Sequence, residues 1–197
     1  MIDKEISNLT AIDTLIRQEQ PFAVYRIPGE KIPCLVTQEE GAVRLIYDLQ
    51  ELNGQRGFVI APFRPNETCP ILLIQSNGPG QPLLLADDAD AVPRDIPSTD
   101  YPSCSEEYAE CFRTFISALR DKTFEKLVLS RKLTIGKPSA FSPSLAFRAA
   151  CQRYIHSYIY LCYTPQTGIW LGSTPEIILS GEKDDWHTVC LLYTSDA

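Results

Sequence analysis

The sequence predicts an α+β domain, in which many short strands are combined with a few amphipathic helices. Two observations carry this prediction. Short apolar runs with an alternating pattern recur along the chain, and turn residues such as Pro-Gly and Asn-Gly separate them. A smaller number of segments repeat apolar residues at helical spacing. The 197 residues, 44% of them hydrophobic, are enough for one domain with a core of its own.

The first hundred residues are predicted to be rich in strands. One short helix is expected over residues 8–18, where Leu9, Ile12 and Ile16 recur at helical spacing. Strands are then expected over residues 22–27, 33–36, 43–47, 57–62 and 71–75. Residues 81–102 are rich in proline and aspartate, so they are predicted to be a linker that closes a strand-rich portion at residue 102.

Helices and strands alternate in the predicted second portion, residues 103–189. A capping box of Ser103 and Glu106 is expected to begin a helix whose apolar face packs on the sheet. The elements expected after it are a strand over residues 126–135, a helix from Pro143, a hairpin of residues 156–163 and 169–171, and a strand over residues 177–179.

Charge and composition exclude several classes of partner. The net charge is −7 and the basic residues are scattered, which argues against nucleic acid or an anionic membrane surface. No apolar run approaches the roughly 18–20 residues of a membrane span, and the N-terminus has no signal-peptide pattern. We therefore expect a cytoplasmic protein with no membrane partner, and the oligomeric state is left open.

The cysteines do not form a metal or disulfide pattern. None of the seven stands in a C-x-x-C pair, and the two histidines lie far from any such spacing. We expect reduced, buried thiols that act as small hydrophobic side chains, at positions Cys34, Cys69, Cys104, Cys111, Cys151, Cys162 and Cys190.

Residues 125–131 read Glu-Lys-Leu-Val-Leu-Ser-Arg and alternate with a period of two. Lys126 and Val128 share one face of the predicted strand, and Leu127 shares the other with the apolar residues that follow. Lys126 thus lies on the less apolar face, where a cleft can form. The alternative is a lysine at an exposed strand edge that only discourages sheet pairing.

Residues 171–176 read Leu-Gly-Ser-Thr-Pro-Glu and follow a second apolar strand. Glu176 stands between a proline and an aliphatic run, where partial desolvation favours the protonated carboxyl group. The alternative is a turn glutamate in solvent. Gly172 is either a position where backbone approaches closely or a plain bend. Two strands that end in a lysine and a glutamate can bring a base and an acid to one pocket.

These two runs, in this order and at this spacing, resemble the chorismate-utilising enzymes, and among them most closely isochorismate synthase. The resemblance covers residues 103–189, with a further similar run at residues 57–63. It implies an incomplete two-layer α/β sandwich of the aminodeoxychorismate synthase type, with the site in the cleft between the layers. Residues 103–189 would begin the chorismate-binding catalytic region.

The resemblance also implies a reaction, the conversion of chorismate to isochorismate by addition of water at C2 and loss of the C4 hydroxyl group. Lys126 would be the general base that activates the water, and Glu176 the general acid that protonates the departing hydroxyl. Gly172 and Thr174 would contact the substrate. A lysine base must be neutral when it acts, so the site has to lower its pKa by desolvation or by nearby cations.

The expected cofactor is Mg²⁺. By the resemblance, its carboxylate ligands and the groups that hold the substrate lie downstream of the residues present, so no metal ligand is predicted in this chain. Residues 190–197 resemble the translation of a transposase sequencing adapter and are expected to be an artefact; a genuine C-terminal extension is the alternative. The polypeptide as written is therefore expected to be inactive.

Other functions stay open. Salicylate synthase keeps the same lysine and glutamate and then eliminates pyruvate, whereas anthranilate and aminodeoxychorismate synthases install ammonia and do not use a lysine there as water base. A non-catalytic, truncated binding module and a fragment that does not fold are further possibilities. The pathway, menaquinone or a catecholate siderophore, is not decided by the sequence.

Overall fold

The computed structural model describes residues 7–38, 41–76, 78, 80–85, 106–132, 134–139, 141–174, 179–182 and 185–188. Within these ranges the chain combines helices with mostly antiparallel sheets, as the α+β prediction requires. The predicted capping serine Ser103, the predicted acid Glu176 and the segment 190–197 lie outside the described residues.

The largest sheet has six strands in the order β1-β7-β3-β2-β8-β9. It joins distant parts of the sequence, because β2 pairs antiparallel with β8 and Val24 lies opposite Leu161. Only β1 and β7 run parallel among the described strands. The strands are β1 Ser7–Asn8, β2 Phe22–Arg26, β3 Cys34–Thr37, β7 Gln81–Leu84, β8 Tyr158–Thr164 and β9 Gly168–Thr174.

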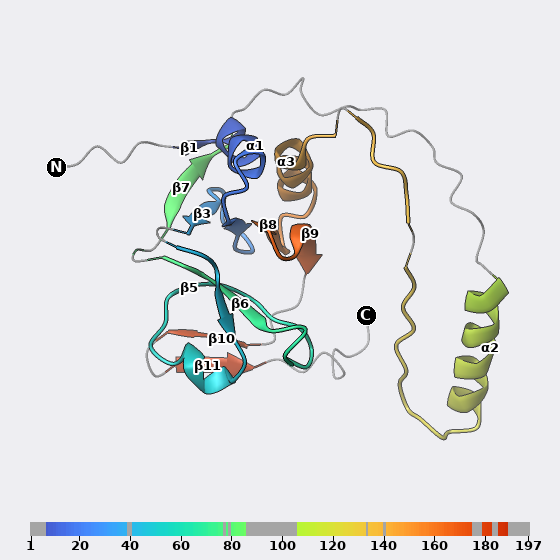
Figure 1. Cartoon of the computed structure of the whole chain (residues 1–197). Helices are drawn as coiled ribbons and strands as arrows, with labels where there is room; N and C mark the ends of the chain where they lie inside the picture. Colours follow the sequence, from blue (N-terminus) through green and yellow to red (C-terminus); the bar gives the residue numbers. More distant parts are fainter. Residues whose placement is uncertain are drawn as a thin grey trace.

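Two smaller sheets lie beside it (Figure 1). One has the order β4-β6-β5, formed by Arg44–Ile46, Ile71–Gln75 and Gly57–Ile60. A 3₁₀ helix, Leu49–Leu52, follows β4 and is capped by Asp48, whose carboxylate accepts the N–H of Gln50 at 3.0 Å. The other sheet is a hairpin of β10 (Leu179–Glu182) and β11 (Asp185–Thr188).

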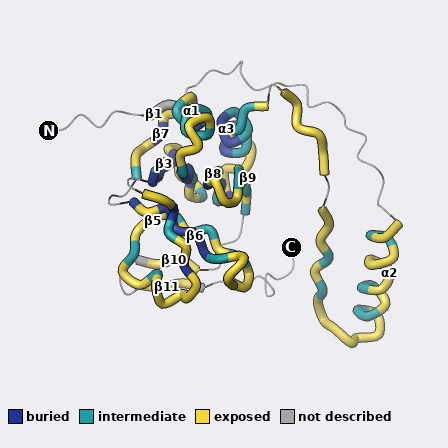
Figure 2. The backbone as a smooth tube through the Cα atoms, in the orientation of Figure 1, coloured by how far each residue is buried: buried dark blue, intermediate teal, exposed yellow. Residues whose placement is uncertain are grey.

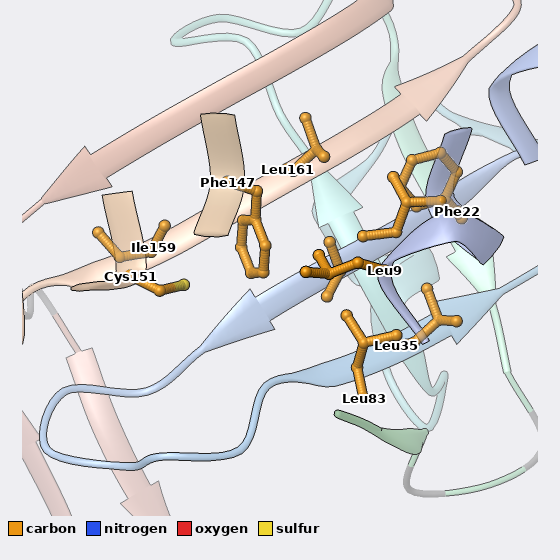
Figure 3. Packing of buried hydrophobic residues seen from close by; sticks show 10 residues of the cluster. Leu9, Phe22, Leu35, Leu83, Phe147, Cys151, Ile159 and Leu161 are labelled. Carbon is orange, nitrogen blue, oxygen red and sulfur yellow. The ribbon is translucent and has the colours of Figure 1, made fainter. Parts of the chain in front are cut away.

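One face of the large sheet is covered by helices α1 (Leu9–Arg17) and α3 (Pro143–Arg153). Figure 3 shows the core between them, where Phe147 of α3 lies over Ile159 and Leu161 of β8. The period of two in β8 places these two side chains on the helix-covered face. Leu9 and Phe22 pack into the same cluster.

Asp13 of α1 fixes the start of α3. The hydroxyl groups of Ser142 and Ser144 donate to its Oδ2 at 3.0 and 2.6 Å. Ser142 is also the N-cap of α3, since its Oγ accepts the N–H of Leu145, and Pro143 follows at the first helical position. One carboxylate thus holds together two helices that are far apart in the sequence.

The other face of the large sheet packs on the small sheet β4-β6-β5. Ala23, Val36 and Cys162 of the large sheet form one buried cluster with Leu72 and Ile74 of β6. The two sheets therefore make two layers, with helices α1 and α3 outside the first.

Helix α2 (Glu106–Arg120) departs from the prediction. It was expected to pack on the sheet, yet none of its residues is buried, and it lies apart from all three described sheets (Figures 1 and 2). The strand expected over residues 126–135 is wrong as well, because residues 126–132 are extended but belong to no ladder among the described residues. This segment runs beside α2 instead, with the guanidinium of Arg131 5.7 Å from the ring centroid of Tyr108. An alternating pattern makes a strand only when a neighbouring strand is in place.

The linker prediction over residues 81–102 is wrong at its beginning. Residues 81–84 form β7, because Leu83 is fully buried in the core and anchors the segment between β1 and β3. The prediction rested on the many prolines and aspartates of residues 81–102 and overlooked the short apolar run at residues 83–85. The first helix, the predicted strands between residues 22 and 75, α3 and the β8–β9 hairpin agree with the structure to within a few residues. Of the strand predicted over residues 177–179, only Leu179 is described, and it begins β10.

Candidate functional site

A hollow of about 850 Å³ lies between the large sheet and the small sheet β4-β6-β5. Its walls come from β2, β8 and β9 on one side and from β5, β6 and the turn after β5 on the other. Aromatic side chains dominate the lining: Tyr25, Phe58, Tyr158, Tyr160 and Trp170. A space of this size is typical of small-molecule sites.

Four of these rings form a closed set of neighbours. Tyr25 lies 5.8 Å from Tyr158 and 6.1 Å from Phe58, measured between ring centroids. Tyr160 completes the set at 6.2 Å from Phe58 and 6.3 Å from Tyr158. Aromatic pairs at these separations stabilise one another beyond the burial of their area. The rings therefore support each other as a rigid wall.

The hydroxyl groups on this wall stay protonated near neutral pH. Burial, a hydrogen bond with Cys34 and the charge of Cys34 raise the pKa of Tyr25 to about 12. Burial and the neighbouring Tyr25 raise the pKa of Tyr158, and burial also raises that of Tyr160. A protonated phenol can both donate and accept a hydrogen bond, so the hollow offers polar anchors on an aromatic surface.

The two predicted substrate-contact residues lie on β9. Gly172 is opposite Tyr160 and Thr174 is opposite Tyr158, and Thr174 lines the hollow. A Cβ atom on Gly172 would come closer than 3.0 Å to the Tyr160 ring. Glycine at this position therefore allows the Tyr160 ring to lie across the strand. The contact with substrate that was predicted for the two residues stays a prediction.

The predicted base is not part of the hollow. Lys126 is exposed, lies on the extended segment that runs beside α2, and is absent from the lining. The predicted acid, Glu176, is outside the described residues, two positions after Thr174. Of the four predicted site residues, the described structure therefore brings only Gly172 and Thr174 to one place.

Among the described residues that line the hollow, none is charged. A substrate with two carboxylate groups needs cationic partners or several donors, because an unpaired buried charge is costly. The hollow as it stands offers hydroxyl groups from three tyrosines, Thr167 and Thr174 within its described lining.

The tyrosines are the residues that sequence reasoning missed. A signal for them was present, since Tyr158, Tyr160 and Cys162 alternate along the predicted strand and so share a face. The run at residues 57–63, which supplies Phe58, was noticed only as a resemblance. What the sequence did not reveal was that β2 and β5 bring Tyr25 and Phe58 to the same face.

The cysteine prediction is confirmed in part. Cys151 and Cys162 are buried and reduced, and burial raises the pKa of each thiol to about 11. Cys69 and Cys111 are reduced but exposed, so for them the expected burial is wrong. Cys69 follows a turn beyond β5, and Cys111 lies on α2, which has no sheet to cover it among the described residues.

The described residues do not fit a magnesium site. No group of three histidine, cysteine, aspartate or glutamate side chains comes together among them, whereas Mg²⁺ requires an octahedral set of oxygen ligands. Within the same described ranges, no helix is long and apolar enough to cross a membrane.

A comparison of the sequence with known protein families identifies the family of this chain. The sequence model of the family described as "Chorismate binding enzyme" matches residues 86–195. Since the match spans more than half of the chain, this protein belongs to the chorismate-binding enzymes. The matched range contains both Lys126 and the Leu-Gly-Ser-Thr-Pro-Glu run. No curated protein and no solved structure matches the chain.

Proposed function

We propose that this chain carries the base and the acid of an isochorismate synthase. In the reaction, neutral Lys126 removes a proton from a water molecule, whose oxygen forms a bond to C2 of chorismate. The ring double bond shifts, the bond from C4 to its hydroxyl group breaks, and protonated Glu176 donates the proton with which that hydroxyl leaves as water. Each proton transfer of this kind accelerates a reaction by roughly 10²–10⁴.

One observation carries the proposal. Within a chain of the chorismate-binding family, β9 runs along the wall of the hollow and ends at Thr174, so Glu176 follows two residues after a lining residue. Glu176, as the acid of the reaction, would then follow the end of β9, a strand in which seven residues pair with residues of β8. The family match alone supports chorismate chemistry in general and does not select this reaction.

The aromatic wall supports a ring-shaped substrate. Chorismate is a six-membered ring with hydroxyl and carboxylate substituents. Its ring can stack on Tyr158 and Tyr160, whose pKa values are raised and whose hydroxyl groups therefore remain hydrogen-bond donors. Aromatic surfaces with a few polar groups are typical of small-molecule sites.

The product of chorismate turnover tests the proposal. The resemblance assigns the magnesium ligands to positions downstream of the printed residues, so the assay uses the complete reading frame, re-read from independent DNA. With Mg²⁺ and chorismate, we expect isochorismate as the product separated by chromatography. Salicylate with pyruvate would identify a salicylate synthase instead, and a folded protein that binds chorismate without turnover would indicate a binding module.

A further inference from the structure

Trp170 differs from the other aromatic side chains of the hollow in its exposure. Of the five aromatic side chains in the described lining, Trp170 alone is exposed, at 54%. It lies on the face of β9 that borders the hollow, opposite the buried Cys162. A large aromatic side chain that is left uncovered in a concave site offers a contact area for a ligand.

The indole of Trp170 is held in one orientation. Its Nε1–H donates to the main-chain carbonyl of Thr167 at 3.0 Å. The N–H of Thr167 donates in turn to Oγ1 of Thr164 at 3.1 Å, and the hydroxyl groups of the two threonines lie 2.8 Å apart. Thr164 is fully buried, so the turn that carries the indole is anchored in the sheet. Because the indole N–H bonds within this turn, the ring meets a ligand with its aromatic surface.

A hydrogen-bonding group lies next to the indole on the same face of β9. The three atoms nearest to a Cβ built on Gly172 are Cε1, Cζ and the hydroxyl oxygen of Tyr160. The Tyr160 hydroxyl group therefore lies over position 172, two residues from Trp170, which is roughly 6–7 Å along a strand. Burial raises the pKa of Tyr160, so this hydroxyl stays protonated near neutral pH and can both donate and accept a hydrogen bond.

The polarity of the lining indicates the kind of ligand. Within its described part no side chain is charged, so an ion placed against it would lose hydration without a partner of opposite sign. An uncharged ring loses little hydration and gains contact with the indole. A hydroxyl group on that ring keeps a hydrogen-bond partner when the Tyr160 hydroxyl is within reach.

We propose that Trp170 and Tyr160 form a subsite for an uncharged six-membered ring that bears a hydroxyl group. The ring stacks on the indole, and its hydroxyl group forms a hydrogen bond with the hydroxyl group of Tyr160. The subsite itself does not depend on the reaction that the protein catalyses.

The link to catalysis rests on the proposed function. Under that function the ring is that of chorismate, and the bonded hydroxyl is the C4 group that the reaction removes. Trp170 and Tyr160 would then position this hydroxyl group, and the carboxylate groups of chorismate would need partners outside the described lining.

Nuclear magnetic resonance of the indole N–H groups tests the subsite in the absence of chorismate. In the complete reading frame, Trp170→Leu and Trp186→Leu assign the two indole signals. Phenol is the probe, because it is an uncharged ring with one hydroxyl group. We expect phenol to shift the Trp170 signal until the site is saturated. The Trp186 signal should stay in place, because Trp186 lies on β11 and is not among the described lining residues.

Toluene and benzoate are the matched probes. Toluene keeps the ring but lacks the hydroxyl group, and benzoate carries a negative charge. Phenol should bind about two- to tenfold more tightly than toluene, as expected for one hydrogen bond, and benzoate should bind more weakly than phenol. In Tyr160→Phe, which keeps the ring contacts, phenol should lose its advantage while toluene binds as before.

Removal of the indole tests the stacking contact. Followed through the amide signal of Gly172, phenol should bind about two- to tenfold more weakly to Trp170→Leu than to the parent protein. Trp186→Leu is the control and should retain the parent affinity.

Several results would overturn the subsite. They are a Trp170 signal that does not move at the solubility limit of phenol, an equal preference for phenol over toluene in Tyr160→Phe and the parent, and tighter binding of benzoate than of phenol. Since no sample contains chorismate, phenol binding without chorismate turnover would refute only the proposed function. Turnover without phenol binding would refute only the subsite.

Discussion

Gly172 and Tyr160 lie directly opposite one another on β9 and β8, and the Tyr160 ring occupies the space that a side chain at position 172 would need. The glycine in the Leu-Gly-Ser-Thr-Pro-Glu run therefore leaves room for the Tyr160 ring, part of the aromatic wall of the hollow, to lie against β9. This relationship links the Leu-Gly-Ser-Thr-Pro-Glu run of this chain to the shape of the hollow.

Substitution of Gly172 by alanine should destabilise the protein. The added methyl group meets the Tyr160 ring, and overpacking of this kind typically costs about 1–3 kcal/mol. Gly136→Ala is the matched control, because no atom lies within 4 Å of a Cβ built there. Denaturant unfolding measures both free energies, and an unchanged midpoint for Gly172→Ala would contradict the packing described.

Removal of the Asp13 carboxylate should loosen the joint between α1 and α3. In Asp13→Ala, the hydroxyl groups of Ser142 and Ser144 lose their common acceptor. Loss of hydrogen bonds to a charged group costs about 1.5–3 kcal/mol. Asp121→Ala removes an exposed acceptor of one serine hydroxyl and should change the unfolding free energy by less than half as much.

The tyrosine wall makes stability depend on pH in the alkaline range. The pKa of Tyr25 rises from 10.0 to about 12 in the folded protein, so between these values the unfolded chain has lost more protons than the folded one. The stabilisation is therefore complete below about pH 10 and is lost as the pH rises toward 12. Chemical denaturation across this range should show falling stability, and Tyr25→Phe should weaken the dependence. A flat profile would contradict the burial of these phenols.

The cysteines should react in two classes. Exposed Cys69 and Cys111 should be alkylated rapidly in the native protein. Cys151 and Cys162 are buried, with thiol pKa values of about 11, so few thiolates form and reagent cannot reach them until the protein unfolds. Mass spectrometry after brief alkylation distinguishes the classes. Equal labelling of Cys162 and Cys69 would show that the sheets do not close over the former.

Elements whose signal is local could be predicted from the sequence. The spacing of Leu9 and Ile12 predicted α1, and Pro143 predicted the start of α3. The hairpin of β8 and β9 followed from two apolar runs around a short turn. In each of these cases, neighbouring residues in the sequence also decide the structure.

The rest depended on distant partners. Residues 126–135 alternate as a strand should, but hydrogen bonds to another strand complete a strand, and the pattern cannot name that partner. The hollow could not be predicted from the sequence for the same reason. Phe58 comes close to Tyr25, and Tyr25 lies beside Tyr158, only because two sheets pack on each other. The predicted pair of Lys126 and Glu176 came from a resemblance, and its chemistry stays a prediction.

We propose that Lys126 and Glu176 transfer the protons in the conversion of chorismate. The most direct test of this proposal is the turnover of chorismate by the complete reading frame and by Lys126→Ala and Glu176→Gln within it, with Lys137→Ala as a control on the same exposed segment. We expect kcat to fall by roughly 10²–10⁴ in each of the first two variants, with KM nearly unchanged, and the control to retain activity. Wild-type kcat in either Lys126→Ala or Glu176→Gln would contradict it.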